Sequence, residues 1–119
     1  MNSLTPKQIA SRLVKTKKTP GNWYRVNLAG VPMYSTYKES AEKYRKRFKR
    51  KIIKALEAFY AVDIETAVSL LVSVRKDSKS MHDVYLAGEL VDTTDEPRST
   101  IRNRWKRKLT QILSEKAKV

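Results

Sequence analysis

The chain offers few side chains for acid–base or covalent catalysis. Its 119 residues include no Cys and one His, His82. A histidine works as a general base only beside a nucleophile or an orienting group, and the position of Asp83 next to it in the sequence does not establish such a partner. The lack of Cys also excludes thiolate nucleophiles, disulfides and cysteine zinc sites. We therefore expect His82 to be structural, and the protein to be neither an enzyme nor the carrier of a cofactor.

One acidic segment could in principle hold a metal ion for phosphodiester cleavage. Asp92, Asp95 and Glu96 carry carboxylates, which are the natural protein ligands of magnesium. No known nuclease spacing surrounds them, and the three glycines are too scattered to form a phosphate-binding loop. Acidic residues just before Pro97 also suit the start of a helix, whose N-terminal dipole they stabilise. We interpret them as helix-capping residues, and predict no catalytic residue and no metal ligand.

The chemistry that the sequence does favour is the binding of a polyanion. Lys and Arg number 26 against 12 Asp and Glu, which gives a net charge of +14. Such a charge repels itself in a compact protein unless a polyanion neutralises it, and nucleic acid is the usual one. The charge is also segregated, because residues 81–97 hold five acids and no base between two basic blocks. This acidic segment could instead dock on the basic surface of a neighbouring copy, so a homodimer stays possible.

The first predicted element is a helix from Thr5 to about Lys17. Thr5 can form a capping box with Gln8, and Pro6 suits the first helical position. The helix should end before residues 19–22, which are rich in turn-forming types.

A small β-hairpin is expected next. Residues 22–28 alternate and are rich in aromatic and branched side chains, which is typical of a strand. Residues 29–30 can make the turn, and residues 31–34 would return as a short strand. Pro32 places this strand at an edge of the sheet.

The most secure prediction is a long helix from Lys38 to Ala61, whose apolar residues fall on one stripe. Its other face is basic, without a single acid between residues 43 and 54, and we predict that it contacts phosphates. The basic residues of this face are Lys43, Lys46, Arg47, Arg50, Lys51 and Lys54.

The rest of the chain is also interpreted as mainly helical. Asp63 can cap a helix to about Lys76, although its Val and Leu residues leave a strand possible. Residues 80–91 form either a helix or a strand. The last helix runs from about Glu96 or Ser99 to Glu115 and has a second basic outer face, formed by Arg98, Arg102, Arg104, Lys106, Arg107 and Lys108.

These elements predict a mostly α fold with one small β-hairpin, of α+β class. We expect a compact single domain of about four to five helices over residues 1–119, with the N-terminal helix and hairpin at 5–36 and a helical body at 38–116. We find no internal repeat in the sequence.

Residues 22–48 resemble a small DNA-binding module made of a sheet and a helix. The likeness lies in the Trp-aromatic-basic-Val strand from Trp23, the short turn, residues 34–37, and the opening of the helix that follows. The module occurs in plant ethylene-response-type transcription factors and in the arm-binding domains of phage integrases. The resemblance implies that the sheet lies in the major groove with the helix behind it. Trp23, Arg25 and Asn27 would then face DNA.

We therefore expect a non-catalytic nucleic-acid-binding protein that binds double-stranded DNA, or RNA, through basic amphipathic helices and an aromatic hairpin. The alternative is a small phage-type inhibitor or adaptor whose partner is a protein machine. No apolar run is long enough to span a bilayer, and the apolar stripes are needed for the core, so no membrane partner is expected. A cytoplasmic protein, associated with the nucleoid or a virus, from a phage or mobile element fits these features.

Overall fold

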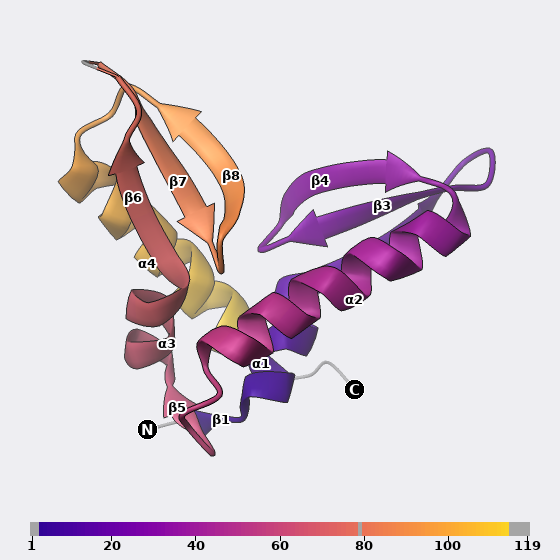
Figure 1. The fold of residues 1–119 in the computed structure, drawn as a ribbon, viewed down its shortest axis with the longest axis horizontal. Coiled ribbons are helices and arrows are strands. Elements are labelled where there is room, and N and C mark those ends of the chain that lie inside the picture. Colours follow the sequence, from indigo (N-terminus) through magenta and orange to yellow (C-terminus); the bar gives the residue numbers. More distant parts are fainter. Residues whose placement is uncertain (1–2, 79, 115–119) are drawn as a thin grey trace.

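The computed structural model describes residues 3–78 and 80–114 (Figure 1). The elements are, in order, β1 (Ser3–Leu4), α1 (Pro6–Leu13), β2 (Val14–Thr19), β3 (Trp23–Leu28), β4 (Val31–Thr36), α2 (Lys38–Ala55), β5 (Val62–Asp63), α3 (Ile64–Leu71), β6 (Val72–Lys76), β7 (His82–Leu86), β8 (Glu89–Thr94) and α4 (Arg98–Ser114). The strands form three antiparallel sheets, ordered β1-β5, β2-β3-β4 and β6-β7-β8.

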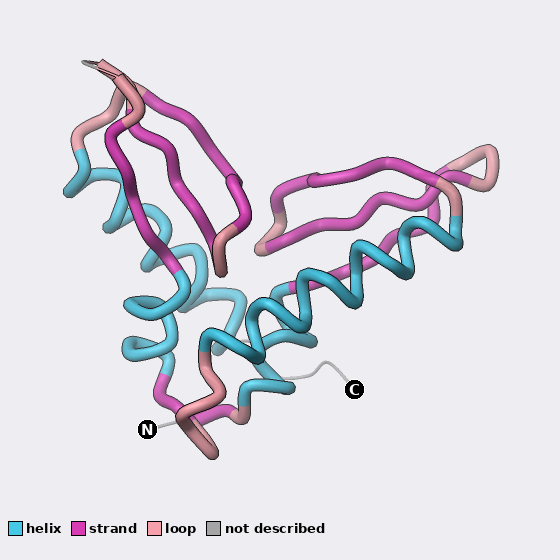
Figure 2. Tube along the Cα trace, viewed as in Figure 1, coloured by secondary structure: helices cyan, strands magenta, loops and turns pink. Residues whose placement is uncertain are grey.

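The prediction of a mostly α fold with one small hairpin is wrong, because the described residues form eight strands in three antiparallel sheets. Strands replace the expected end of the first helix, and they also form in the two stretches for which a strand had been left open. Helix α1 ends at Leu13, and the segment expected to continue it to Lys17 is strand β2. Residues 72–76 form strand β6 rather than the end of a helix, and residues 80–91 contain most of the β7–β8 hairpin. Figure 2 shows how much of the chain is extended. The described helices number four.

The expectation that the chain has no internal repeat is also wrong. Two units, the first at residues 3–55 and the second at 62–114, have the same order: a two-residue strand, an eight-residue helix, three antiparallel strands and a long helix. The sequence Val-x-Leu-Ala-Gly occurs at residues 26–30 and again 58 positions later, at 84–88.

The repeat extends to details of the backbone. Both sheets have a bulge after the equivalent valine, Val26 or Val84. In the first unit the N–H of Ala29 donates to the carbonyl of Leu13 at 2.7 Å, and the equivalent bond in the second unit, from Ala87 to Leu71, measures 2.8 Å. The short strands β1 and β5 pair with each other and join the two units.

Each three-stranded sheet uses one face for the core and leaves the other open. Alternation places Val26 and Leu28 of β3 on the inner face, where both are buried, and α2 packs along this sheet. Val84 and Leu86 are their equivalents in β7, and α4 lies against that sheet. Buried residues of both units belong to one hydrophobic cluster. The outer faces of the two sheets are therefore the broad surfaces left for a partner.

None of the helices that the structure describes is long and apolar enough to cross a membrane.

Candidate nucleic-acid interface

The predicted basic face of α2 is divided by an ion pair between the units. Arg47 and Lys51 both bond the carboxylate of Glu89 in β8, at 2.8 Å and 2.5 Å. The Glu89 side chain is only 7% exposed, whereas those of Arg47 and Lys51 are 45% and 41% exposed. We call these three residues the Glu89 clamp. Two of the six predicted phosphate contacts thus have an acidic partner inside the protein.

The clamp sets the charge state of Glu89. Burial alone would raise the pKa of this carboxyl, but the hydrogen bonds and charges of Lys51 and Arg47 outweigh burial and leave the pKa below its usual value. The other four predicted residues of α2 are exposed and have no acidic partner within the described part of the chain: Lys43, Lys46, Arg50 and Lys54.

The basic face of α4 is also partly neutralised. Arg104 bonds Asp92 at 3.0 Å and also pairs with Glu96, and Lys106 lies 3.4 Å from Glu65 in α3. Lys108 lies over the ring of Trp105, with its ammonium 4.8 Å from the ring centre, and burial lowers the pKa of Lys108. Arg102 and Arg107 are exposed, and no acid pairs with them among the described residues.

These pairs also account for most of the acidic segment at 81–97. Glu89, Asp92 and Glu96 have cationic partners within the chain. The carboxylate of Asp83 accepts a hydrogen bond from the hydroxyl of Thr93 at 2.9 Å. Little unpaired acid is therefore left for docking on a neighbouring copy.

A different surface, the outer face of the first sheet, gathers basic side chains that form no ion pair within residues 3–78 and 80–114. Register places Lys17 opposite Arg25, Lys15 opposite Asn27, and Thr19 opposite Trp23. Because these residues alternate with the buried ones, they share the face turned away from α2. Lys15, Lys17, Trp23 and Arg25 are exposed, and β2, β3 and β4 contain no Asp or Glu. We call Lys15, Lys17, Trp23, Arg25 and Asn27 the basic sheet face.

The second unit shows that this fold does not require such a face. At the positions equivalent to Lys15, Lys17 and Arg25 it has Ser73, Arg75 and Asp83. Arg75 stands opposite Asp83 in the register, and its guanidinium lies 5.5 Å from the ring centre of Tyr85. A sheet of the same topology thus forms with balanced charges on its outer face. The excess of positive charge on the outer face of the first sheet is therefore not required for folding.

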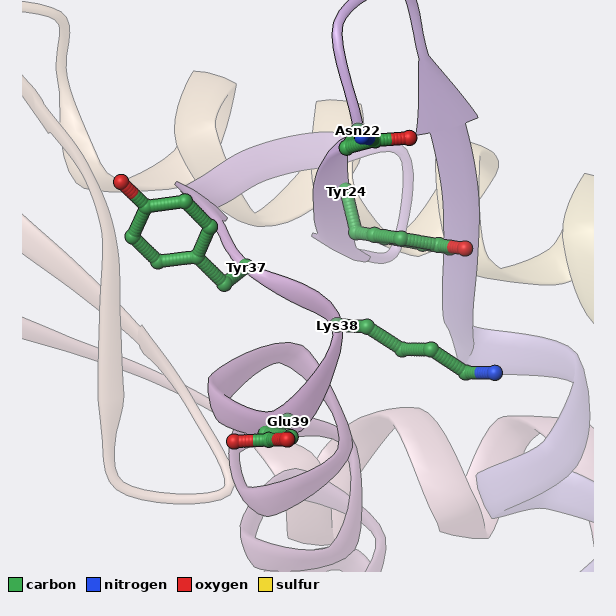
Figure 3. Close-up of a pocket in the computed structure, with 5 residues that line it drawn as sticks. All are labelled: Asn22, Tyr24, Tyr37, Lys38 and Glu39. Atoms are coloured by element: carbon green, nitrogen blue, oxygen red, sulfur yellow. The ribbon is translucent and has the colours of Figure 1, made fainter.

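The aromatic residues of the first unit continue this face. Trp23 stacks on Tyr37, with ring centres 4.7 Å apart and planes at 22°. Beside Tyr37 is a shallow pocket lined by Asn22, Tyr24, Tyr37, Lys38 and Glu39 (Figure 3). In this view the Tyr24 and Lys38 side chains extend to one side and the Tyr37 ring to the other.

The resemblance identified three members of the basic sheet face, Trp23, Arg25 and Asn27, and the sequence analysis missed the other two. These three were predicted to face DNA, and the structure brings them together with Lys15 and Lys17. Those lysines were assigned to a helix, although Lys15 and Lys17 alternate with Val14 and Thr16, as polar and less polar residues of a strand do. The expected helix contacts on α2 lie elsewhere, because α2 covers the inner face of the same sheet.

The residues first considered for catalysis are not assembled into a site. His82 is half-buried in β7, and Asp83, as the next residue of the strand, points to the opposite face. Within residues 3–78 and 80–114, no group of three or more His, Cys, Asp or Glu side chains is placed to hold a metal ion.

No family model, no curated protein and no solved structure matches this chain.

Proposed function

We propose that this protein binds double-stranded DNA without catalysis, with the basic sheet face as its main contact. The proposal rests on one observation: Lys15, Lys17 and Arg25 lie together and exposed, on strands that contain no acid, and no acid among the described residues pairs with them. Elsewhere the basic residues are often paired, as Arg47, Lys51 and Arg104 are.

The shape of this surface suits a duplex. The major groove of B-DNA admits a β-ribbon, whose side chains can reach both phosphates and base edges. Lys15 and Lys17 are two residues apart on β2, a spacing of about 7 Å along the strand, so they can bond separate phosphates. Arg25, opposite Lys17, has the planar donor geometry that pairs with phosphate or with guanine.

The resemblance of residues 22–48 to sheet-plus-helix DNA-binding modules supports the same orientation. Strands β3 and β4 lie within this stretch, and β2, which precedes it, completes the three-stranded sheet. Helix α2 packs behind the sheet, on the side away from the basic sheet face. The exposed bases of α2 are on the far side of this layer. A rigid duplex on the basic sheet face therefore cannot contact them at the same time, and we assign them at most a secondary role.

Two charge-reversal variants separate the two surfaces. The test variant changes Lys15, Lys17 and Arg25 to Glu, and the matched control changes Lys43, Arg50 and Lys54 to Glu. Both replace three exposed bases that pair with no acid in the described part of the chain, and both alter the net charge equally. Arg47 and Lys51 are left intact, because changing them would leave Glu89 buried and unpaired.

Binding to labelled duplex DNA, duplex RNA and single strands would be measured from roughly 50 to 200 mM salt. We expect duplex DNA to bind with a steep salt dependence, and the test variant to lose at least about a hundredfold in affinity. The slope of log K against log salt should flatten by about 3, because three phosphate contacts are lost. The control should retain most of the binding.

Selective loss in the control would move the interface to α2. Weak binding of the wild type to every nucleic acid would contradict the proposal and favour the alternative, an inhibitor or adaptor with a protein partner.

A further inference from the structure

The stacked pair of Trp23 and Tyr37 is unusually open to solvent for two large aromatic rings. Trp23 is 41% exposed and Tyr37 is 65% exposed. Their stacking uses one face of each ring, and the exposure of Tyr37 leaves its other face largely accessible. An exposed apolar patch made of adjacent aromatic rings is typical of a ligand-binding or interaction surface.

The second unit shows that the fold forms without this pair. The position of Trp23 is taken by Met81. Tyr37 accepts the backbone hydrogen bond of Ala41 at 2.8 Å, and the equivalent acceptor, for Ile101 at 3.1 Å, is Pro97. Neither equivalent residue is aromatic, yet a similar sheet and a similar long helix form, so folding does not explain the pair.

The surroundings of the pair favour a nucleic-acid ligand over an apolar one. On the outer face, Trp23 is two residues from Arg25, and Lys17 lies across from Arg25. Lys38 follows Tyr37 directly, while Glu39 is the one acid that lines the adjoining pocket. The π-face of an aromatic ring with cations beside it is the usual platform for an unstacked base.

A base within continuous B-DNA cannot stack on this platform, because its faces are covered by neighbouring bases. We infer that the Trp23–Tyr37 pair stacks one unpaired nucleobase at the point where a duplex ends in a single-stranded extension. The extension leaves the duplex at the Trp23 end of the basic sheet face, and its first base covers the free face of Tyr37. The ligand is thus a duplex with an overhang rather than uninterrupted DNA. This inference rests on the proposed function.

The test compares one blunt duplex with the same duplex carrying a three-nucleotide overhang at one end. Stacking of one base is worth about 1–3 kcal/mol, so we expect the wild type to bind the overhang duplex about 5- to 150-fold more tightly. Tyr37→Ala should remove this preference and leave both the blunt-duplex affinity and its salt dependence unchanged, whereas Tyr37→Phe should retain it. Tyr60→Ala is the matched control, because Tyr60 is 92% exposed and lies outside the site.

Tryptophan fluorescence gives a second readout. The chain has two tryptophans, and Trp105 is buried at 3% exposure, so quenching by DNA reports on Trp23. We expect the overhang duplex to quench the emission more strongly than the blunt duplex. Equal affinities and equal quenching, or a preference that survives Tyr37→Ala, would overturn the inference. The proposed function is tested separately. It fails if the wild type does not bind the blunt duplex, or if the variant of Lys15, Lys17 and Arg25 binds the blunt duplex as tightly as the wild type does.

Discussion

Removing Glu89 and removing its two partners should destabilise the protein to different degrees. The three side chains form the Glu89 clamp between β8 and α2, but only Glu89 is buried. Glu89→Gln leaves Arg47 and Lys51 free to turn toward water, because more than 40% of each side chain is already exposed. The loss is then limited to charged hydrogen bonds that are partly replaced by solvent, about 1–2 kcal/mol.

The double variant Arg47→Gln and Lys51→Gln has a larger expected cost. It leaves a carboxylate of 7% exposure without a cation, and an uncompensated buried charge costs about 3–5 kcal/mol. Urea unfolding at pH 7, followed by circular dichroism, measures both differences. The double variant should be less stable than Glu89→Gln by at least about 1 kcal/mol.

The pH dependence gives an independent check with a defined sign. In the wild type the folded pKa of Glu89 is lowered, so the stability that it contributes is present above its unfolded pKa of about 4.3 and is lost as the pH falls through the lower folded pKa. In the double variant, burial without cations should raise the folded pKa, so protonation relieves the cost. The difference in the free energy of unfolding between the wild type and the double variant should therefore become smaller as the pH falls from 7 toward 4.5. The buried-charge reasoning would be refuted if Glu89→Gln and the double variant lost equal free energy of unfolding at pH 7. It would also be refuted if the double variant became still less stable, relative to the wild type, at lower pH.

Two further predictions concern the elements that the repeat has in common. Asp63→Ala removes the carboxylate that accepts the Thr66 N–H at 2.7 Å and should lower the midpoint of urea unfolding at pH 7. That bond lowers the pKa of Asp63, so the effect should disappear as the pH falls through the folded pKa, below about 4, whereas Asp63→Asn should keep most of the cap. Gly88→Ala should cost about 1 kcal/mol in thermal unfolding. Gly88 has φ +83°, and the nearest atom to an added Cβ is the Lys51 ammonium at 3.9 Å, so a much larger loss would show that crowding dominates.

The sequence predicted the elements whose signals are local. The capping box of Thr5 and Gln8 is present and begins α1, and the apolar stripe of α2 is buried at Ala41, Phe48 and Ile52. The predicted end of this long helix at Ala61 is wrong, because α2 ends at Ala55. Local signals also failed where one residue ends a helix and the next begins a strand without a break. Val14 and Val72 each continue the apolar pattern of the preceding helix but adopt extended backbone, and no Gly or Pro marks the change.

The second hairpin was missed for a related reason. Ala87 and Gly88 both have positive φ and form the turn between β7 and β8, but residues 80–91 were predicted only as either a helix or a strand, with no turn assigned within them. The first hairpin has the same Ala-Gly turn and was predicted correctly, so a comparison of residues 26–30 with 84–88 would have identified the second.

The candidate site could be predicted only in part, because charge pairing depends on contacts between distant segments. The sequence shows that Arg47 and Lys51 are basic but not that Glu89, some 40 residues away, lies beside them. The basic sheet face likewise depends on the register of β2 against β3, which places Lys17 opposite Arg25.

The covalent link between the two repeated units has a consequence for how such a protein can change. In a symmetric dimer of identical chains every substitution appears twice, so a basic surface on one subunit is necessarily present on the other. Here the pairing of β1 with β5 joins the two units within one chain, and each half can mutate alone. One half could thus accumulate the charge of Lys15, Lys17 and Arg25 while the other acquired Asp83 and Glu89. The second half, in which acidic and basic residues nearly balance, supplies Glu89 to the clamp and so limits the self-repulsion that an equally basic pair of halves would suffer.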